Sequence, residues 1–278
     1  MKKFTMLLIV IAMIFIAAGC GDNNSSKQPD NDKKESTTET DKKRSIETSK
    51  SSENGKKQKE EQAQAIKPEY KLNEKNWSIE PIGDAPSKVV LVTIDDAPDK
   101  HAVEMAIKLK KMNVPAIFFV NGHFIDSEKG KNDLKKIHDM GFVIGNHTYS
   151  HNSLPEQSNA RQKKEITDVD QMVEDAIGKR PSFFRAPFGQ NTDNSKKVAA
   201  DEDLTLMNWT YGYDWNNEYM TKDTIQKIMV NAPELNDGAN LLMHDREWTN
   251  DALEGIIKGL RDKGYGFVDP KKIKGYHP

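Results

Sequence analysis

The sequence predicts an α/β fold, an incomplete barrel of about seven parallel strands that follows a secretory leader and a polar linker. Short apolar segments alternate with segments whose apolar residues recur at helical spacing, and this alternation implies parallel strands joined by crossover helices. Chemically active side chains follow several of the apolar segments, as expected where a barrel gathers a site at the carboxyl ends of its strands. An open doubly wound sheet is the alternative arrangement.

Residues 1–20 form the predicted leader. Lys2 and Lys3 precede an apolar run over 4–18, which is shorter than the roughly 20 apolar residues that span a bilayer. The small residues before Cys20, the only cysteine in the chain, resemble a bacterial lipobox, although Ala17 stands where Leu is usual. The resemblance implies cleavage before Cys20, its lipidation, and anchoring on the extracellular face of the cell membrane. Ordinary signal cleavage that leaves an unused thiol is the alternative.

Residues 21–68 form the predicted linker, and 69–278 form the predicted folded domain. The linker is rich in Ser, Thr, Asn, Asp, Glu and Lys, and it has too few large apolar residues to offset the chain entropy lost on folding. The remainder has the size of one domain. A formal net charge of -2 for the whole chain argues against nucleic acid as the partner.

The first expected strand begins with Val89-Val90-Leu91-Val92, a continuous apolar run that fits a strand buried on both faces. Helical spacing marks 101–112 and two later apolar faces, and Gly264 suits the end of the last helix. The expected strands are 89–95, 116–121, 143–147, 183–187, 204–210, 240–244 and 265–268, and the two later helical faces are Ile166, Val169, Val173 and Ile177, and Leu253, Ile256, Ile257 and Leu260.

Two adjacent carboxylates, Asp95 and Asp96, end the first strand. Adjacent strand residues point to opposite sides, so the two carboxylates can take different roles. Carboxylates this close repel each other, so either a cation lies nearby or the protonation of one of them shifts. An Asp-rich turn without a chemical role is the alternative.

His147 and His151 lie four residues apart, so both imidazoles can meet one ion in a helical turn or a tight loop. With a carboxylate they make a His₂Asp set, and three protein ligands with an open position are typical of a catalytic metal site. Thr148 stands where the zinc-protease motif HEXXH has its catalytic Glu, so a base must come from elsewhere, and Asp95 is the candidate. Histidines on the surface or in the core are the alternative.

Three further polar groups belong to the ends of later strands. Arg185 ends the fourth strand and can grip a carboxylate in two places. Asp214 follows the fifth strand, and His244 ends the sixth. The aromatic residues around Asp214 are Trp209, Tyr211, Tyr213 and Trp215. Rings of this kind line sugar sites or form ordinary core. For Arg185 the alternative is a surface residue in a turn, and for His244 it is a histidine of the core.

Together these motifs resemble the polysaccharide deacetylase family, which has the NodB homology domain and is also known as carbohydrate esterase family 4. The resemblance covers about 88–268, and five motifs occur in the family's order. They read Thr93-Ile94-Asp95-Asp96-Ala97-Pro98, His147 to His151, Arg185 to Gly189, Tyr213-Asp214-Trp215 and Leu242-Met243-His244. The resemblance implies a distorted barrel of seven or eight strands, a divalent metal and removal of acetyl groups from N-acetylated glycans. The metal is commonly Zn²⁺, with Co²⁺, Ni²⁺ and Mn²⁺ as alternatives.

The resemblance also assigns roles to single residues. Asp95 is the expected base, Arg185 holds it, and Asp214 orients the general acid His244. The expected metal ligands are Asp96, His147 and His151. The residues expected to contact substrate are Tyr149, Pro187, Phe188 and Trp215.

Two departures from the family pattern concern Ala97 and the region of Gly212. Ala97 replaces the usual Gly after the paired Asp residues, and the fourth motif lacks its usual earlier Asp. They leave a catalytically weak or inactive glycan-binding lipoprotein as one alternative, and a metal-dependent amidase acting on wall peptides or small amides as another. The anchor makes peptidoglycan the expected substrate, because that polymer lies within reach, and we expect a monomer.

Overall fold

The computed structural model describes residues 67–278. The leader, Cys20 and residues 21–66 of the linker lie outside the described residues, so the interpretations made of them stay predictions. Within 67–278, no helix combines the length and the apolar character needed to cross a membrane.

Seven parallel strands form the main sheet, in the order β7-β6-β5-β4-β3-β8, and β9 pairs with the beginning of β3. The strands are β3 (Val89–Ala97), β4 (Ile117–Val120), β5 (Val143–Asn146), β6 (Phe183–Phe184), β7 (Thr205–Leu206), β8 (Ala239–His244) and β9 (Gly266–Phe267). All seven strand predictions are confirmed. The fourth and fifth strands are much shorter than expected. Their last hydrogen bonds to the neighbouring strand are donated by Arg185 N and Met207 N, and the chain leaves the sheet after these residues.

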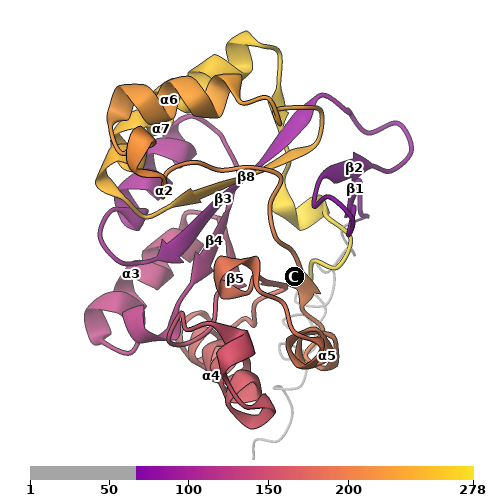
Figure 1. The fold of residues 1–278 in the computed structure, drawn as a ribbon, viewed down its shortest axis with the longest axis vertical. Coiled ribbons are helices and arrows are strands. Elements are labelled where there is room, and N and C mark those ends of the chain that lie inside the picture. Colours follow the sequence, from indigo (N-terminus) through magenta and orange to yellow (C-terminus); the bar gives the residue numbers. More distant parts are fainter. Residues whose placement is uncertain (1–66) are drawn as a thin grey trace, which may run out of the picture. The chain divides into compact units, whose positions relative to one another are not determined.

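Six helices cover the outer face of this sheet (Figure 1). They are α2 (Ala102–Lys111), α3 (Glu128–Asp139), α4 (Asn159–Ile177), α5 (Asp193–Asp201), α6 (Lys222–Asn231) and α7 (Glu247–Asp262). Neighbours contact each other in the order α6, α7, α2, α3, α4, α5, which follows the order of the strands beneath them. The short 3₁₀ helices are η1 (Gly122–Phe124), η2 (Leu154–Glu156), η3 (Pro187–Gly189), η4 (Asn217–Tyr219) and η5 (Pro270–Lys272).

The helices α3, α5 and α6 were not predicted from the sequence. Few residues of α3 and α5 are apolar, whereas α6 carries Ile225, Ile228 and Met229 at helical spacing, a signal that sequence reasoning missed. Each of the three helices begins at a side-chain cap, where Ser127, Thr192 or Thr221 accepts a hydrogen bond from a backbone N–H of the first turn. Those three caps were readable in the sequence as helix starts.

Alternate residues of the strands separate an inner core from an outer one. On β3, Val89 and Leu91 belong to an inner cluster with Phe119 and Phe183, whereas Val90 and Val92 pack in an outer cluster with the apolar faces of the helices. An open doubly wound sheet would carry helices on both faces, whereas here the inner face packs on itself. The barrel is therefore the correct arrangement.

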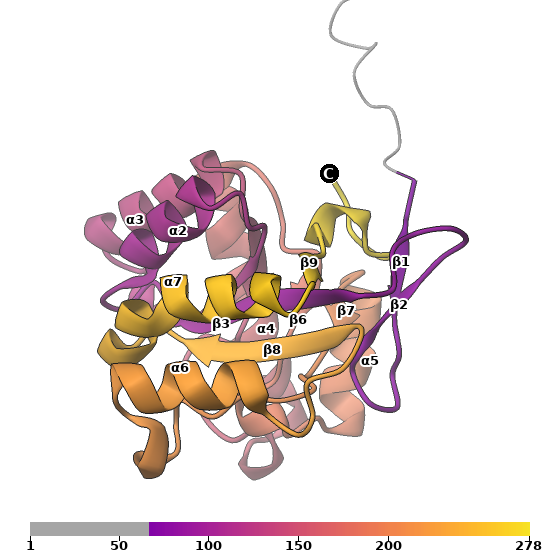
Figure 2. The ribbon, with the colours of Figure 1, turned by 90° about the horizontal axis from the view of Figure 1, so that it is seen from above.

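The barrel closes loosely between β8 and the chain that follows β7. Tyr211 and Leu241 form a single parallel bridge, in which Leu242 N donates to the Tyr211 carbonyl oxygen at 2.9 Å. At the amino-terminal end of the strands, the antiparallel pair β1 (Tyr70–Leu72) and β2 (Ile79–Pro81) packs Tyr70 and Ile79 into the inner cluster. Figure 2 shows the arrow of β8 pointing away from this hairpin. The hairpin, which periodicity did not predict, thus fills the amino-terminal end and leaves the carboxyl end for a site.

Candidate active site

The two carboxylates of β3 reach the same cavity, although neighbours on a strand point to opposite sides. Asp95 points inward like Leu91 and is 1% exposed. Asp96 would point to the outer face if the strand continued, but its φ of 59° lies in the left-handed region and turns the carboxylate back. Both residues line the cavity at the carboxyl end of the barrel. A backbone held in a sparsely populated region is typical of functional sites.

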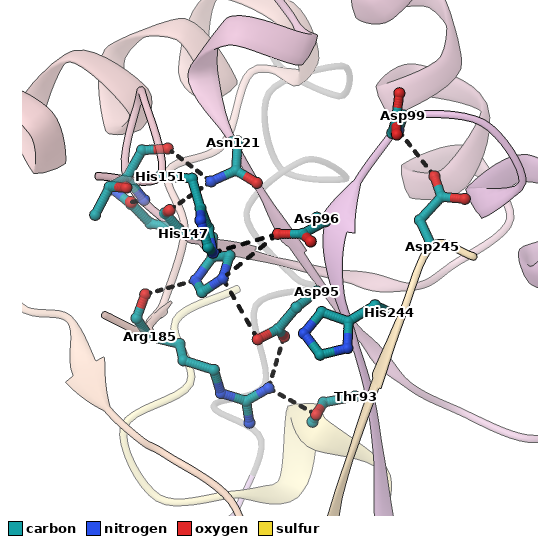
Figure 3. A network of polar contacts seen from close by, with 12 residues as sticks. Thr93, Asp95, Asp96, Asp99, Asn121, His147, His151, Arg185, His244 and Asp245 are labelled. Atoms are coloured by element: carbon teal, nitrogen blue, oxygen red, sulfur yellow. Dashed lines mark hydrogen bonds and ion pairs between the residues drawn. The ribbon is translucent and has the colours of Figure 1, made fainter. Parts of the chain in front are cut away.

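His147 follows β5, and the ring orientation is set by the neighbouring strand. Its Nδ1 lies 2.8 Å from the carbonyl oxygen of Arg185, so Nδ1 carries the proton and Nε2 is left with a lone pair. Nε2 faces Asp95 Oδ2 at 3.5 Å and Asp96 Oδ1 at 3.8 Å (Figure 3). A carbonyl acceptor behind a histidine ring is the usual support of a metal-binding imidazole.

The loop that carries His151 is fixed by buried polar contacts. Asn146 Oδ1 accepts from Thr148 N at 2.9 Å, and Asn121 Nδ2 donates to the carbonyl oxygen of His147 at 2.6 Å. Thr148 and His151 both have positive φ, of 67° and 56°. These constraints direct His151 Nε2 toward Asp96 Oδ1 at 3.5 Å.

Asp96, His147 and His151 fit a divalent cation by the chemistry of their donors. One ligand atom from each of the three lies within 4.8 Å of the others. Burial and the neighbouring His147 lower the pKa of His151 to about 4, so its imidazole is neutral at physiological pH. Burial raises the pKa of Asp96, but interactions with His147, His244, His151 and Arg246 outweigh burial and leave the pKa below its usual value. One carboxylate and two imidazoles are the ligands that Zn²⁺ and related ions prefer.

Arg185 is fully buried beneath the cavity. Its Nη1 donates to Asp95 Oδ1 at 2.6 Å and to Thr93 Oγ1 at 2.8 Å, and its Nη2 donates to the carbonyl oxygen of Asn208 at 2.8 Å. The guanidinium stacks on the ring of Phe119 at 4.3 Å. These contacts fix one oxygen of Asp95 and leave Oδ2 directed toward the cavity side, where His147 lies.

His244 and Asp214 form a second buried pair across the cavity. His244 Nδ1 lies 2.6 Å from Asp214 Oδ1, while His244 N and Thr249 Oγ1 donate to Asp214 Oδ2 at 2.6 and 2.7 Å. Burial alone would lower the pKa of His244, but the Asp214 carboxylate outweighs burial and raises the pKa to about 9. The pKa of Asp214 is lowered, because His244 and the other donors outweigh the effect of burial. His244 is therefore a protonated imidazole at neutral pH.

The cavity between these groups has a volume of about 520 Å³ and opens beside two exposed aromatic rings. Phe188 and Trp215 are 61% and 48% exposed and line its walls. Tyr149 and Pro187 do not line it: the Tyr149 hydroxyl donates to Asp126 Oδ2 at 3.0 Å, and Pro187 is buried. Of the four residues expected to contact substrate, two are thus brought to the cavity and two are not.

The departures at Ala97 and Gly212 leave the cavity open. Ala97 is buried in the outer cluster against the helices, so its methyl group does not narrow the cavity. A Cβ at Gly212 would lie 2.3 Å from the carbonyl oxygen of Leu242. The glycine therefore permits the close approach between the fourth motif and β8 that brings Asp214 to His244.

Sequence reasoning missed Asp245 and Arg246, which follow the predicted acid. Asp245 is fully buried and accepts from the backbone N of Asp99 and Lys100 at 2.8 and 2.9 Å, so it ties the loop after β3 to the loop after β8. Arg246 Nη2 donates to Asp96 Oδ2 at 2.6 Å. The only sequence signal was a charged dipeptide directly after a strand-end histidine.

The class of this protein is defined by a parallel barrel whose His₂Asp donor set lies between two buried pairs, Asp95 with Arg185 and His244 with Asp214. The family model for polysaccharide deacetylase matches residues 82–207. A peptidoglycan-N-acetylglucosamine deacetylase of Bacillus cereus is 33% identical over 187 residues, which cover 64% of this chain and 66% of that protein. The chain belongs to the polysaccharide deacetylase family.

Two further relatives are a protein named as a deacetylase and a protein named as a pseudoenzyme. The peptidoglycan-N-acetylmuramic acid deacetylase PdaC of Bacillus subtilis is 30% identical over 194 residues, which cover 69% of this chain and 40% of that protein. The solved structure of PdaC matches with a TM-score of 0.59 and covers 67% of this chain and 89% of the solved one. A pseudoenzyme of carbohydrate esterase family 4 from Bacillus anthracis is 27% identical, with a TM-score of 0.59 over 65% of this chain and 63% of that one. The chain thus spans about two thirds or less of the curated relatives' length.

Proposed function

We propose that this protein is a metal-dependent hydrolase that removes N-acetyl groups from the amino sugars of a cell-wall glycan, with peptidoglycan as the polymer. The observation that carries the proposal is the arrangement of three groups around one cavity. The donor set of Asp96, His147 and His151 lies between Asp95, which is held by Arg185, and His244, which is held by Asp214. Amide hydrolysis needs such a base and such an acid on either side of the reacting carbonyl.

Asp96, His147 and His151 would hold the ion, with Zn²⁺ the first choice for these donors and Co²⁺, Ni²⁺ or Mn²⁺ the alternatives. A divalent ion bound there supplies a Lewis acid for the acetamide carbonyl and a water of lowered pKa. Three ligands from the protein leave room for that chemistry.

The protein's own groups move the protons. Asp95 Oδ2 takes the proton of the attacking water, while Arg185 fixes the other carboxylate oxygen. His244 gives its proton to the departing nitrogen, because an amine leaves poorly as an anion. Asp214 keeps that proton in place at neutral pH. The products are acetate and a free amino sugar.

The exposed rings of Phe188 and Trp215 support a sugar substrate, because aromatic faces bury the apolar side of a sugar ring. Relatives named as N-acetylglucosamine and N-acetylmuramic acid deacetylases of peptidoglycan point to the same polymer.

The test is acetate release by the full chain, purified in detergent, from peptidoglycan, with metal content measured on the same sample. We expect about one divalent ion per chain, released acetate, and digested glycan fragments that lose acetyl mass on one amino sugar. Fragment mass spectrometry then shows whether the glucosamine or the muramic acid residue has changed. Metal binding without acetate release would contradict the proposed activity and align the protein with its pseudoenzyme relative.

We also propose that a lipid on Cys20 holds the protein at the outer face of the cell membrane. The support is the position of the only cysteine directly after the small residues of the leader. Replacing Cys20 with Ala is expected to abolish incorporation of a labelled fatty acid and to move the protein into the soluble fraction of fractionated cells. Labelling and membrane retention that persist unchanged in Cys20→Ala would rule out the anchor.

A further inference from the structure

Arg246 lies at the start of α7 beside the cavity and has no role among those described above. Its Nη2 donates to Asp96 Oδ2 at 2.6 Å, and its Nη1 donates to the carbonyl oxygen of Asp245 at 3.1 Å. Nη1 also lies 4.0 Å from Asp99 Oδ2. The arginine side chain is 36% exposed and lines the cavity, whereas the Asp96 side chain is 11% exposed. The contact is therefore partly screened from solvent and reaches a candidate metal ligand directly.

The two oxygens of Asp96 face different partners. Oδ1 lies 3.5 Å from His151 Nε2 and 3.8 Å from His147 Nε2, whereas Oδ2 accepts from Arg246. A carboxylate without such a partner is free to rotate or to bind a cation through both oxygens. We propose that Arg246 is a positioning residue that makes Asp96 a one-oxygen ligand. This inference rests on the metal site of the proposed function.

A firm support is needed because Asp96 sits on a turned backbone rather than in a regular strand, with a φ of 59°. Asp245 supplies part of that support. Its buried carboxylate accepts from Asp99 N and Lys100 N, so the loop after β3 and the loop that carries Arg246 are tied together. The fork of the guanidinium can then contact the carboxylate and a backbone carbonyl at once, which an ammonium group does less well.

The positive charge of Arg246 also repels the cation, and this repulsion weakens binding, whereas orienting Asp96 strengthens it. That repulsion is weakened by solvent, since the side chain is 36% exposed, and it is offset by Asp96 and by Asp99 nearby. Partners that orient a metal ligand typically change metal affinity about 10–100-fold. We therefore expect the orienting effect to dominate, and removal of Arg246 to weaken metal binding.

The experiment measures the Zn²⁺ dissociation constant of the full chain by competition with a chromophoric chelator. In Arg246→Ala it is expected to rise about 10–100-fold. Arg246→Lys keeps a donor and the charge, so its Zn²⁺ dissociation constant is expected to lie between those of the wild type and Arg246→Ala. If Arg246→Ala is unstable, a raised dissociation constant in Arg246→Lys tests the same inference. Arg261→Ala is the matched control: it removes the same charge from the same helix, where Arg261 contacts the Met112 carbonyl oxygen away from the cavity. It is expected to bind Zn²⁺ like the wild type.

Substitution with Co²⁺ reports the binding mode. If the freed carboxylate of Arg246→Ala binds through both oxygens, the coordination number rises and the visible absorption of Co²⁺ becomes weaker than in the wild type. A Zn²⁺ dissociation constant in Arg246→Ala that is unchanged or lower, or an unchanged Co²⁺ spectrum, overturns the inference alone. A wild-type chain that binds neither ion overturns the proposed metal site and this inference with it.

Discussion

Replacing Asp95 with Asn is expected to lower kcat/KM for deacetylation by about 10²–10⁴-fold, while about one divalent ion per chain stays bound. Asn keeps the shape of the side chain but cannot take up the proton of the attacking water. The ion stays because the three candidate ligands are Asp96, His147 and His151. Rates of acetate release and metal content, measured on the same samples, check both parts.

The buried contact with Arg185 adds a consequence for stability. Breaking a buried ion pair by removing one partner costs about 3–5 kcal/mol, and Asn, which still offers an oxygen to Arg185, is expected to cost less. Thermal unfolding of Asp95→Asn therefore has to be measured so that activity is compared between folded samples. Asp193→Asn makes the same chemical change at a fully exposed position on α5 and is expected to behave like the wild type.

His151→Ala provides the opposite pattern, because it removes one of three ligands and is expected to lose both the ion and the activity. Asp95 would be wrong as the base if Asp95→Asn lost the ion as well, or if it deacetylated at the wild-type rate. The pair of variants thus separates the base from the metal ligands.

Replacing Asp214 with Asn is expected to move the alkaline limb of the pH profile of kcat/KM to lower pH and to reduce the maximum rate. The Asp214 carboxylate raises the pKa of His244 to about 9 against the effect of burial. Once the charge of Asp214 is removed, burial still lowers the pKa of His244, and only the weaker effects of Asp95 and Asp96 raise it. The limb should therefore move to lower pH, by up to about 2 pH units. Because a bound divalent ion repels the imidazolium, the wild-type limb lies at or below pH 9.

The same pair links stability to pH. The folded-state pKa of His244 is raised, so the stability that the pair contributes is fully present below the unfolded pKa of about 6.5 and is lost as the pH rises through about 9. In Asp214→Asn this loss of stability in alkali should disappear. Thermal unfolding measured between these pH values checks it without any substrate.

His244→Ala tests the role of the imidazole as the acid. It should remove the alkaline limb and most of the activity on an N-acetylated amino sugar, about 10²–10⁴-fold, with the metal retained. It should affect an activated acetyl ester much less, because a good leaving group hardly needs the proton. Equal losses on amide and ester, or an alkaline limb that does not move in Asp214→Asn, would exclude His244 as the acid.

The amino-acid sequence was enough to predict the strands in their order along the chain and the reactive side chains at their ends. A continuous apolar run marks the strand 89–95, because a strand buried on both faces needs apolar residues at successive positions. Parallel strands bring their carboxyl ends to one edge, so Asp95, His147, Arg185 and His244 had to lie near one another once the strands were identified. The family resemblance paired Arg185 with Asp95 and Asp214 with His244, and in the structure the side chains of each pair are in contact.

The closure of the barrel and the orientation of Asp96 follow from contacts between segments that lie far apart in the sequence. The barrel closes through hydrogen bonds between 208–211 and β8, with only an isolated bridge at Tyr211 and Leu241, and this leaves no periodic signal. The turn of Asp96 toward the cavity depends on one backbone angle, and its contact with Arg246 joins residues 150 positions apart. The hydrogen bond from the Tyr149 hydroxyl to Asp126 likewise joins two separate segments of the chain. Such features arise from packing between distant segments, whose pairwise contacts no local pattern in the chain encodes.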